Sequence, residues 1–159
     1  MSKLTLTTEA DRYVLVTRHF AAPPEVVYRA FTEPEIIQKW LLGPGGWTMP
    51  VCISEARPGG KMRYEWSNSK GAGFHITGEY VEVQPPSRIV HIERMFLPDP
   101  TPDNRIETRF EPDGTGTRMT MRMTLPDAET RKMMLSTGME HGMEASYVRL
   151  ETMLQPVAH

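Results

Sequence analysis

The sequence has little of several features that identify common classes of protein. It contains one cysteine, Cys52, in 159 residues, so it cannot form an intrachain disulfide framework. No apolar run approaches the roughly 20 residues that a membrane-spanning helix needs, and we expect no insertion into a membrane. The N-terminal segment lacks the apolar core of a signal peptide, so a cytoplasmic location is expected.

The net charge and the short motifs also exclude several functions and assign none. The formal net charge of −2 provides no broad basic face for nucleic acid, which is not expected as a partner. The five histidines and the single cysteine lack the paired spacing of a zinc site. No glycine cluster follows a strand and opens a helix as a phosphate-binding loop does, and no Gly-x-Ser-x-Gly motif occurs. We therefore predict neither a metal nor a cofactor, and the catalytic residues, if any, stay unassigned.

Up to about Leu125 the chain contains a series of segments with the period of two that is typical of half-buried β-strands. Turns rich in glycine, proline and aspartate separate these segments. The predicted strands span residues 3–8, 13–20, 49–55, 61–67, 74–83, 88–96, 105–111 and 117–125. Short connections make the strands antiparallel, so the sheet would have one apolar face that another layer must cover.

Three helices are predicted. The first begins at Pro23-Pro24-Glu25, and the second begins at Glu33-Pro34-Glu35 and ends at Gly43-Pro44. The third is predicted to run unbroken from Asp127 to Gln155, over about 29 residues or roughly 43 Å. Its apolar face carries Leu135, Met139, Met143, Tyr147, Leu150 and Leu154. A helix of this length would cover the whole sheet.

Together these elements predict one domain, residues 1–159, with an α+β helix-grip fold. In this fold a curved antiparallel β-sheet wraps around a long C-terminal α-helix, and two short helices follow the first strands. A curved sheet cannot contact a straight helix everywhere, so a cavity is expected between them. Gly138 and Gly142 support this, because each glycine inside a helix costs roughly 1 kcal/mol relative to alanine and needs a reason. Close packing on a neighbouring element is one reason, and room for a bound molecule is the other.

The cavity is predicted to hold a small apolar or amphipathic molecule. Methionine, with 12 residues, would give a deformable lining, although it also fills irregular gaps in ordinary cores. Tyr64 and Trp66 share a strand face with Met62 and would add polar groups that orient a ligand. The predicted ligand-binding residues are Met62, Tyr64, Trp66, Phe74, Ile76, Arg94, Phe96, Met119, Met121, Gly138, Met139, Gly142, Met143 and Ser146.

The strand of residues 88–96 leaves two registers open. Its more apolar face carries Val90, Ile92, Arg94 and Phe96. We place this face inward, which would put Arg94 near the cavity beside a carboxylate such as Glu107 or an anionic ligand. Alternatively, Arg94 lies at the solvated end of the strand. If the register is reversed, His91 and Glu93 face inward as a candidate acid–base pair.

Five segments in order resemble one family. They are TRHFAAPPEVVYRAFTEPEIIQKWLLGP, RPGGKMRYEW, GEYVEVQPPSRIVHIE, GTGTRMTMRM and GMEHGMEASYVRLETML. From about Leu4 to Leu154 the chain thus resembles the homologues of the chaperone-ATPase activator, within the START-type, birch-pollen-allergen-like (SRPBCC) superfamily. The chain departs from many relatives at Leu41 and Met143, where they often have tryptophan, and in having Met119, Met121 and Met123 in place of branched aliphatic residues. The resemblance implies a helix-grip fold with a ligand cavity; members bind lipids, hormones and polyketides, and some catalyse reactions.

Three functions remain open at this point. The first is a soluble small-molecule-binding protein. The second is an enzyme of cyclase, dehydratase or hydrolase type, with His75, His91, Glu93 or Tyr64 as an acid–base group at the cavity wall. The third is a regulatory protein-interaction module acting on a chaperone or other ATPase, which would need an exposed patch outside the cavity. Exposed strand edges also make a homodimer plausible.

Overall fold

The computed structural model describes residues 3–96 and 99–154, and its strands form one antiparallel sheet. The eight strands follow the order β1-β2-β8-β7-β6-β5-β4-β3 across the sheet. Their bounds are β1 (Thr5–Glu9), β2 (Tyr13–Phe20), β3 (Trp47–Ser54), β4 (Lys61–Asn68), β5 (Gly73–Gln84), β6 (Arg88–Phe96), β7 (Asn104–Asp113) and β8 (Gly116–Thr124). Each strand predicted from an alternating segment is therefore present.

Two short helices connect β2 to β3, as predicted. They are α1 (Pro24–Thr32) and α2 (Pro34–Trp40), and each begins with a proline at its first position. Proline suits this position because its fixed φ is helical and its missing N–H would have no partner inside the helix. None of the described helices combines the length and the apolar composition needed to cross a membrane.

The prediction of one unbroken C-terminal helix is wrong. The structure has α3 (Ala128–Leu135), which Asp127 caps by accepting a hydrogen bond from the Thr130 N–H at 2.8 Å, and a separate α4 (Met139–Leu154). Between them Gly138 adopts φ +80°, the left-handed conformation that ends helices. The apolar spacing continues across this break, so periodicity alone did not reveal it. The predicted end at Gln155 lies outside the described residues.

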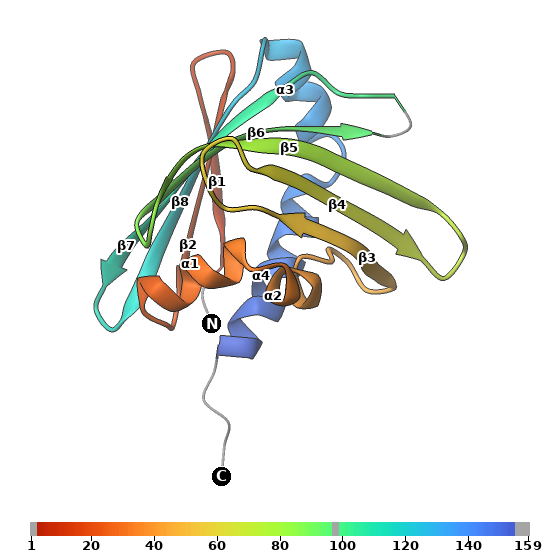
Figure 1. The fold of residues 1–159 in the computed structure, drawn as a ribbon. Coiled ribbons are helices and arrows are strands. Elements are labelled where there is room, and N and C mark those ends of the chain that lie inside the picture. Colours follow the sequence, from red (N-terminus) through yellow and green to blue (C-terminus); the bar gives the residue numbers. More distant parts are fainter. Residues whose placement is uncertain (1–2, 97–98, 155–159) are drawn as a thin grey trace.

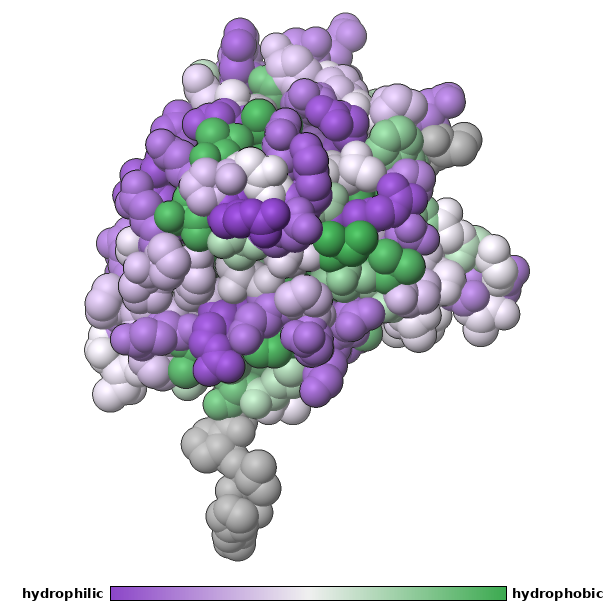
Figure 2. Space-filling model, in the orientation of Figure 1, coloured by the Kyte–Doolittle hydropathy of each residue, from purple (hydrophilic) through white to green (hydrophobic). Residues whose placement is uncertain are grey.

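The sheet curves around α4, which runs along its inner face, while α1 and α2 cross one end and α3 lies near the other (Figure 1). This arrangement confirms the predicted helix-grip fold, with α4 in the place of the long helix. At 16 residues α4 is roughly 24 Å long, which is shorter than the roughly 43 Å predicted for one unbroken helix. In the view of Figure 2 the surface over β3–β6 is largely hydrophilic, with small hydrophobic patches between the polar side chains.

An aromatic cluster fills the inner face where α1, α2 and the C-terminal half of α4 meet the sheet. The ring centroid of Phe31 lies 4.9 Å from that of Trp40 and 5.2 Å from that of Phe110. The ring centroids of Phe20 and Tyr147 are 5.6 Å apart. The edge-to-face pairs Phe31–Phe110 and Phe20–Tyr147 add to the stabilisation that burial of large rings provides. This end of the molecule is consequently a packed core.

A buried ion pair fixes α4 to β2. The side chain of Arg18 is 1% exposed, and its Nη1 donates to Glu151 Oε1 at 2.8 Å and also to the carbonyl oxygen of His19. Glu151 Oε2 accepts a hydrogen bond from the Ala21 N–H at 3.0 Å. Because a buried charge without a partner is costly, this pair defines the position of α4 over the sheet.

Candidate ligand-binding site

The register of β6 decides which side chains face α4. His91 pairs with Ile106 and Glu93 pairs with Asn104, and both partners are buried on the inner face. The preferred inward placement of Val90, Ile92, Arg94 and Phe96 is therefore wrong, and the reversed register holds. The prediction placed Val90 inward because it is apolar. In the structure Val90 lies on the outer face, yet it is only 1% exposed, because the residues paired with it on both neighbouring strands carry charged side chains that cover it. The stems of such side chains cover apolar surface while their charged ends remain in water.

Arg94 and Phe96 thus lie on the outer face, away from the predicted cavity. The Nε of Arg94 donates to Asp103 Oδ1 at 2.8 Å, a hydrogen bond that raises the pKa of Arg94 and lowers the pKa of Asp103. The suggested partner Glu107 instead binds Arg88 and Arg109. The ring of Phe96 stacks on that of His75 with centroids 4.5 Å apart, so His75 also belongs to the outer face.

The small residues of α4 and of the turn before it do not face the sheet. Gly138 lies in the exposed break between α3 and α4. A Cβ added to Gly142 would have only Pro44 Cδ within 4 Å, at 3.9 Å, and Ser146 Oγ accepts a hydrogen bond from the Gly43 N–H at 2.8 Å. Gly142 and Ser146 therefore face the loop after α2 and not the sheet.

The remaining predicted residues share the inner face. They are Met62, Tyr64, Trp66, Phe74, Ile76, Met119, Met121, Met139 and Met143. Met139 and Met143 lie two turns and one turn before Tyr147, whose ring packs on Phe20, so they point in the same direction. The structure brings these residues to one side of the sheet.

Burial changes along this inner face. Tyr64, Trp66 and Met119 are buried, whereas Phe74, Met121, Met139 and Met143 are only partly buried although they pack against the core. Met95, which sequence reasoning did not select, is partly buried on the same face beside Ile76. The space between the N-terminal half of α4 and the sheet is thus less completely filled than the aromatic end.

Polar side chains also lie on the inner face, on β6 and β7. His91 Nε2 and Glu93 Oε1 are 2.8 Å apart, and their side chains are 12% and 20% exposed. Asn104, next to Glu93 across the ladder, is 5% exposed. His91 Nδ1 and Asn104 Oδ1 are buried and have no hydrogen-bond partner among residues 3–96 and 99–154. Native structures leave few buried polar atoms unpaired, so two of them close together indicate a missing partner.

A second polar group on the inner face consists of hydroxyls. Tyr80 Oη and Ser54 Oγ are 2.6 Å apart, and burial raises the pKa of Tyr80 despite its hydrogen bonds to Ser54 and Tyr64. Burial is also the main cause that raises the pKa of Tyr64 well above its usual value, with Tyr80, Cys52 and Glu93 adding to it. Burial likewise raises the pKa of Cys52 to about 11. These groups are neutral at pH 7 and act as hydrogen-bonding groups there.

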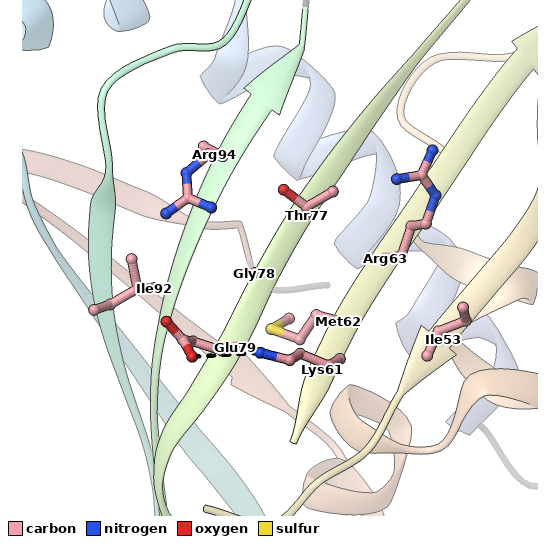
Figure 3. A pocket seen from close by; sticks show the side chains of 9 residues that line it. All are labelled: Ile53, Lys61, Met62, Arg63, Thr77, Gly78, Glu79, Ile92 and Arg94. Carbon is pink, nitrogen blue, oxygen red and sulfur yellow. Dashed lines mark ion pairs between the residues drawn. The ribbon is translucent and has the colours of Figure 1, made fainter. Parts of the chain in front are cut away.

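A hollow of about 360 Å³ lies on the opposite, outer face of the sheet, where sequence reasoning did not place one. Its outer-face lining consists of Ile53, Lys61, Arg63, Thr77, Glu79, Ile92 and Arg94. Met62 and Gly78, which pair with each other and belong to the inner-face register, complete it. In Figure 3 α4 lies behind the strands, while the charged side chains are on the near side. Each of these charges has a partner: Lys61 contacts Glu79 at 3.7 Å, Arg63 binds Glu65 at 2.6 Å and Arg94 binds Asp103.

Asn104 and Met95 were missed, but the sequence held a signal for Asn104. It lies two, four and six residues before Ile106, Thr108 and Phe110, so it shares their face by the period of two. The prediction began this strand at residue 105 and so excluded it. Met95 was not predicted because the wrong register placed it on the outer face of β6.

Comparisons with known proteins agree with this fold. Residues 21–155 match the family described as activator of Hsp90 ATPase homolog 1-like protein. A solved structure of a protein from Rhodobacter sphaeroides is 28% identical with a TM-score of 0.90, and the match covers 96% of this chain and 97% of that one. A protein from Nitrosomonas europaea is 25% identical with a TM-score of 0.80, covering 92% and 96%. The AHSA1 protein from Silicibacter pomeroyi shares the fold at 21% identity, with a TM-score of 0.73 and coverage of 89% and 96%. The comparison with curated proteins gave no match.

Proposed function

The chain belongs to the family of activator of Hsp90 ATPase homolog 1-like proteins, and we propose that it is a small-molecule-binding protein. Its ligand is an apolar or amphipathic molecule held between the N-terminal half of α4 and the inner face of the sheet.

The observation that carries this proposal is the incomplete burial of apolar side chains on two facing walls. Met95 and Met121 belong to the sheet, Met139 and Met143 belong to α4, and all four are partly exposed while packing against the core. Soluble proteins generally bury such side chains where elements pack together, and a bound apolar molecule would complete their burial. Methionine suits this role because its unbranched side chain adapts to different shapes.

The outer hollow is a weaker candidate for the same ligand. Four of its nine lining residues are charged, and each of these four already has an ionic partner, either within the hollow or beside it. An apolar molecule there would desolvate these groups without offering them new partners. The inner face presents apolar walls and few charges, which favours it as the ligand site.

The test is titration of the protein with the fluorescent apolar probe N-phenyl-1-naphthylamine. Met95→Trp and Met143→Trp place a larger side chain on opposite walls of the proposed site. Met133→Trp is the matched control, because Met133 is 49% exposed on α3. We expect each of the first two variants to weaken probe binding by at least roughly tenfold, since one mis-sized group in an apolar pocket costs on the order of 1–3 kcal/mol.

The control should bind the probe as the unmodified protein does, and circular dichroism should show all three variants folded. If both wall variants bind as tightly as the control, the probe lies elsewhere and the proposal fails. If the unmodified protein binds no probe at all, the proposal also fails.

A further inference from the structure

Six buried side-chain atoms make no hydrogen bond within the described residues, and two of them belong to the β6–β7 ladder. These two are His91 Nδ1 and Asn104 Oδ1, and their chemistry bears on the ligand. Asn104 stands opposite Glu93 across the β6–β7 ladder, and His91 precedes Glu93 by two residues on the same face. The two atoms thus belong to side chains at diagonal positions of one ladder, which are close enough for one ligand to reach both.

The contact with Glu93 determines what His91 can offer. A carboxylate only accepts hydrogen bonds, so His91 Nε2 must be the donor in the 2.8 Å contact with Glu93 Oε1. In the neutral ring, the other nitrogen, Nδ1, is then an acceptor with an available lone pair. The orientation is fixed by Glu93, in the way that a carboxylate fixes the tautomer of a histidine in many sites.

Asn104 offers a second acceptor beside the first. Its Oδ1 is unpaired although the residue is 5% exposed, and asparagine is rarely buried without satisfied hydrogen bonds. An apolar residue of similar size would fill this position without leaving a polar atom unpaired. Two acceptors at diagonal positions on one face of the β6–β7 ladder are matched by a ligand that carries two neighbouring donors.

Resting on the proposed function, we propose that the ligand is a molecule with an apolar body and two adjacent hydroxyl groups, of the diol or catechol type. One hydroxyl donates to His91 Nδ1 and the other donates to Asn104 Oδ1. The apolar body lies against Met95 and the methionines of α4. A ligand of this class supplies the partners that both buried atoms lack.

The first experiment compares naphthalene, 2-naphthol and 2,3-dihydroxynaphthalene, measured by displacement of N-phenyl-1-naphthylamine from the unmodified protein. The three compounds share one apolar body and differ only in having zero, one or two hydroxyls. We expect affinity to rise about tenfold with each hydroxyl, since a hydrogen bond that satisfies a buried group typically changes binding by this order. If 2,3-dihydroxynaphthalene binds no tighter than naphthalene, this inference is overturned while the proposed function stands. If no probe and no naphthalene bind, the proposed function itself fails.

Variants then assign the effect to the two side chains. Asn104→Leu should remove the roughly tenfold advantage of 2,3-dihydroxynaphthalene over 2-naphthol. His91→Phe is combined with Glu93→Leu, so that no carboxylate is left unpaired, and should remove the advantage of the first hydroxyl. Retention of the full hydroxyl preference in both variants would contradict the assignment.

The stability of the ligand-free Asn104→Leu variant gives a readout that a purely structural role would not produce. Removal of an unpaired buried polar atom should raise the melting temperature of the free protein, because nothing is lost and an apolar contact is gained. A side chain that serves only packing or strand pairing would instead lower the melting temperature when replaced. A lower melting temperature together with unchanged hydroxyl preference would overturn the role of Asn104.

Discussion

Alanine at Gly138 and at Gly142 should change stability in opposite directions, although the two residues lie four positions apart. Gly142 is inside α4, and an added Cβ would meet only Pro44 Cδ at an ordinary contact distance of 3.9 Å. Helix propensity alone should then stabilise Gly142→Ala by about 1 kcal/mol. Gly138 has φ +80°, and an added Cβ would have no atom within 4 Å. Gly138→Ala should therefore destabilise the protein by about 1–2 kcal/mol, because alanine disfavours the left-handed conformation.

Thermal unfolding followed by circular dichroism measures both effects. For a chain of this length, 1 kcal/mol corresponds to about 2–4 °C, so we expect a rise of this size for Gly142→Ala and a fall of at least this size for Gly138→Ala. Gly138→Asn is the control and should lose less, because asparagine tolerates the left-handed conformation better than alanine. Stabilisation by Gly138→Ala equal to that of Gly142→Ala would mean that α3 and α4 form one continuous helix, and the reasoning would be refuted.

Three further predictions concern groups around the site. Arg18→Met should lower the free energy of unfolding by about 3–5 kcal/mol, because it leaves Glu151 buried and unpaired, and adding Glu151→Met should recover much of this loss in urea denaturation. Gly78→Ala should lower the free energy of unfolding by about 1–3 kcal/mol and weaken probe binding, since the new Cβ would lie 2.3 Å from the Ile92 carbonyl oxygen and displace β6. An unchanged free energy of unfolding would contradict the close approach of β5 and β6 at this position. Cys52, whose pKa burial raises from 9.0 to about 11, should react with iodoacetamide at pH 8 roughly 100-fold more slowly than a free cysteine. Its folded pKa exceeds the unfolded value, so its contribution to stability is present below about pH 9 and is lost as pH rises towards 11. Cys52→Ala should flatten this part of the pH profile.

The fold was predictable because its signals are local. Alternation identified all eight strands, and prolines marked the first turns of α1 and α2. The break at Gly138 was signalled by a glycine between two amphipathic segments, but the spacing from Leu135 to Met139 is four residues and so continued the helical pattern across it. Only the backbone conformation of Gly138 distinguishes two helices from one.

The candidate site was predictable only in part, since it depends on register and on contacts between distant segments. Hydropathy placed Val90 and Ile92 inward, whereas paired charged side chains on neighbouring strands cover them from outside. That error reversed the positions of Arg94 and His91. Likewise, Gly142 and Ser146 were predicted to line the cavity, but they face the loop at Gly43, more than 90 residues away in the sequence.

Native mass spectrometry of the protein, after incubation with an extract of lipids and metabolites, tests the central claim most directly. The proposed function predicts a reproducible additional mass of a few hundred daltons that is released on denaturation, and the hydroxyl inference predicts that the released molecule carries adjacent hydroxyl groups. The Met95→Trp variant should bind much less of it, and Met133→Trp should bind as much as the unmodified protein. A spectrum that shows only the mass of the polypeptide, before and after incubation, would contradict the account.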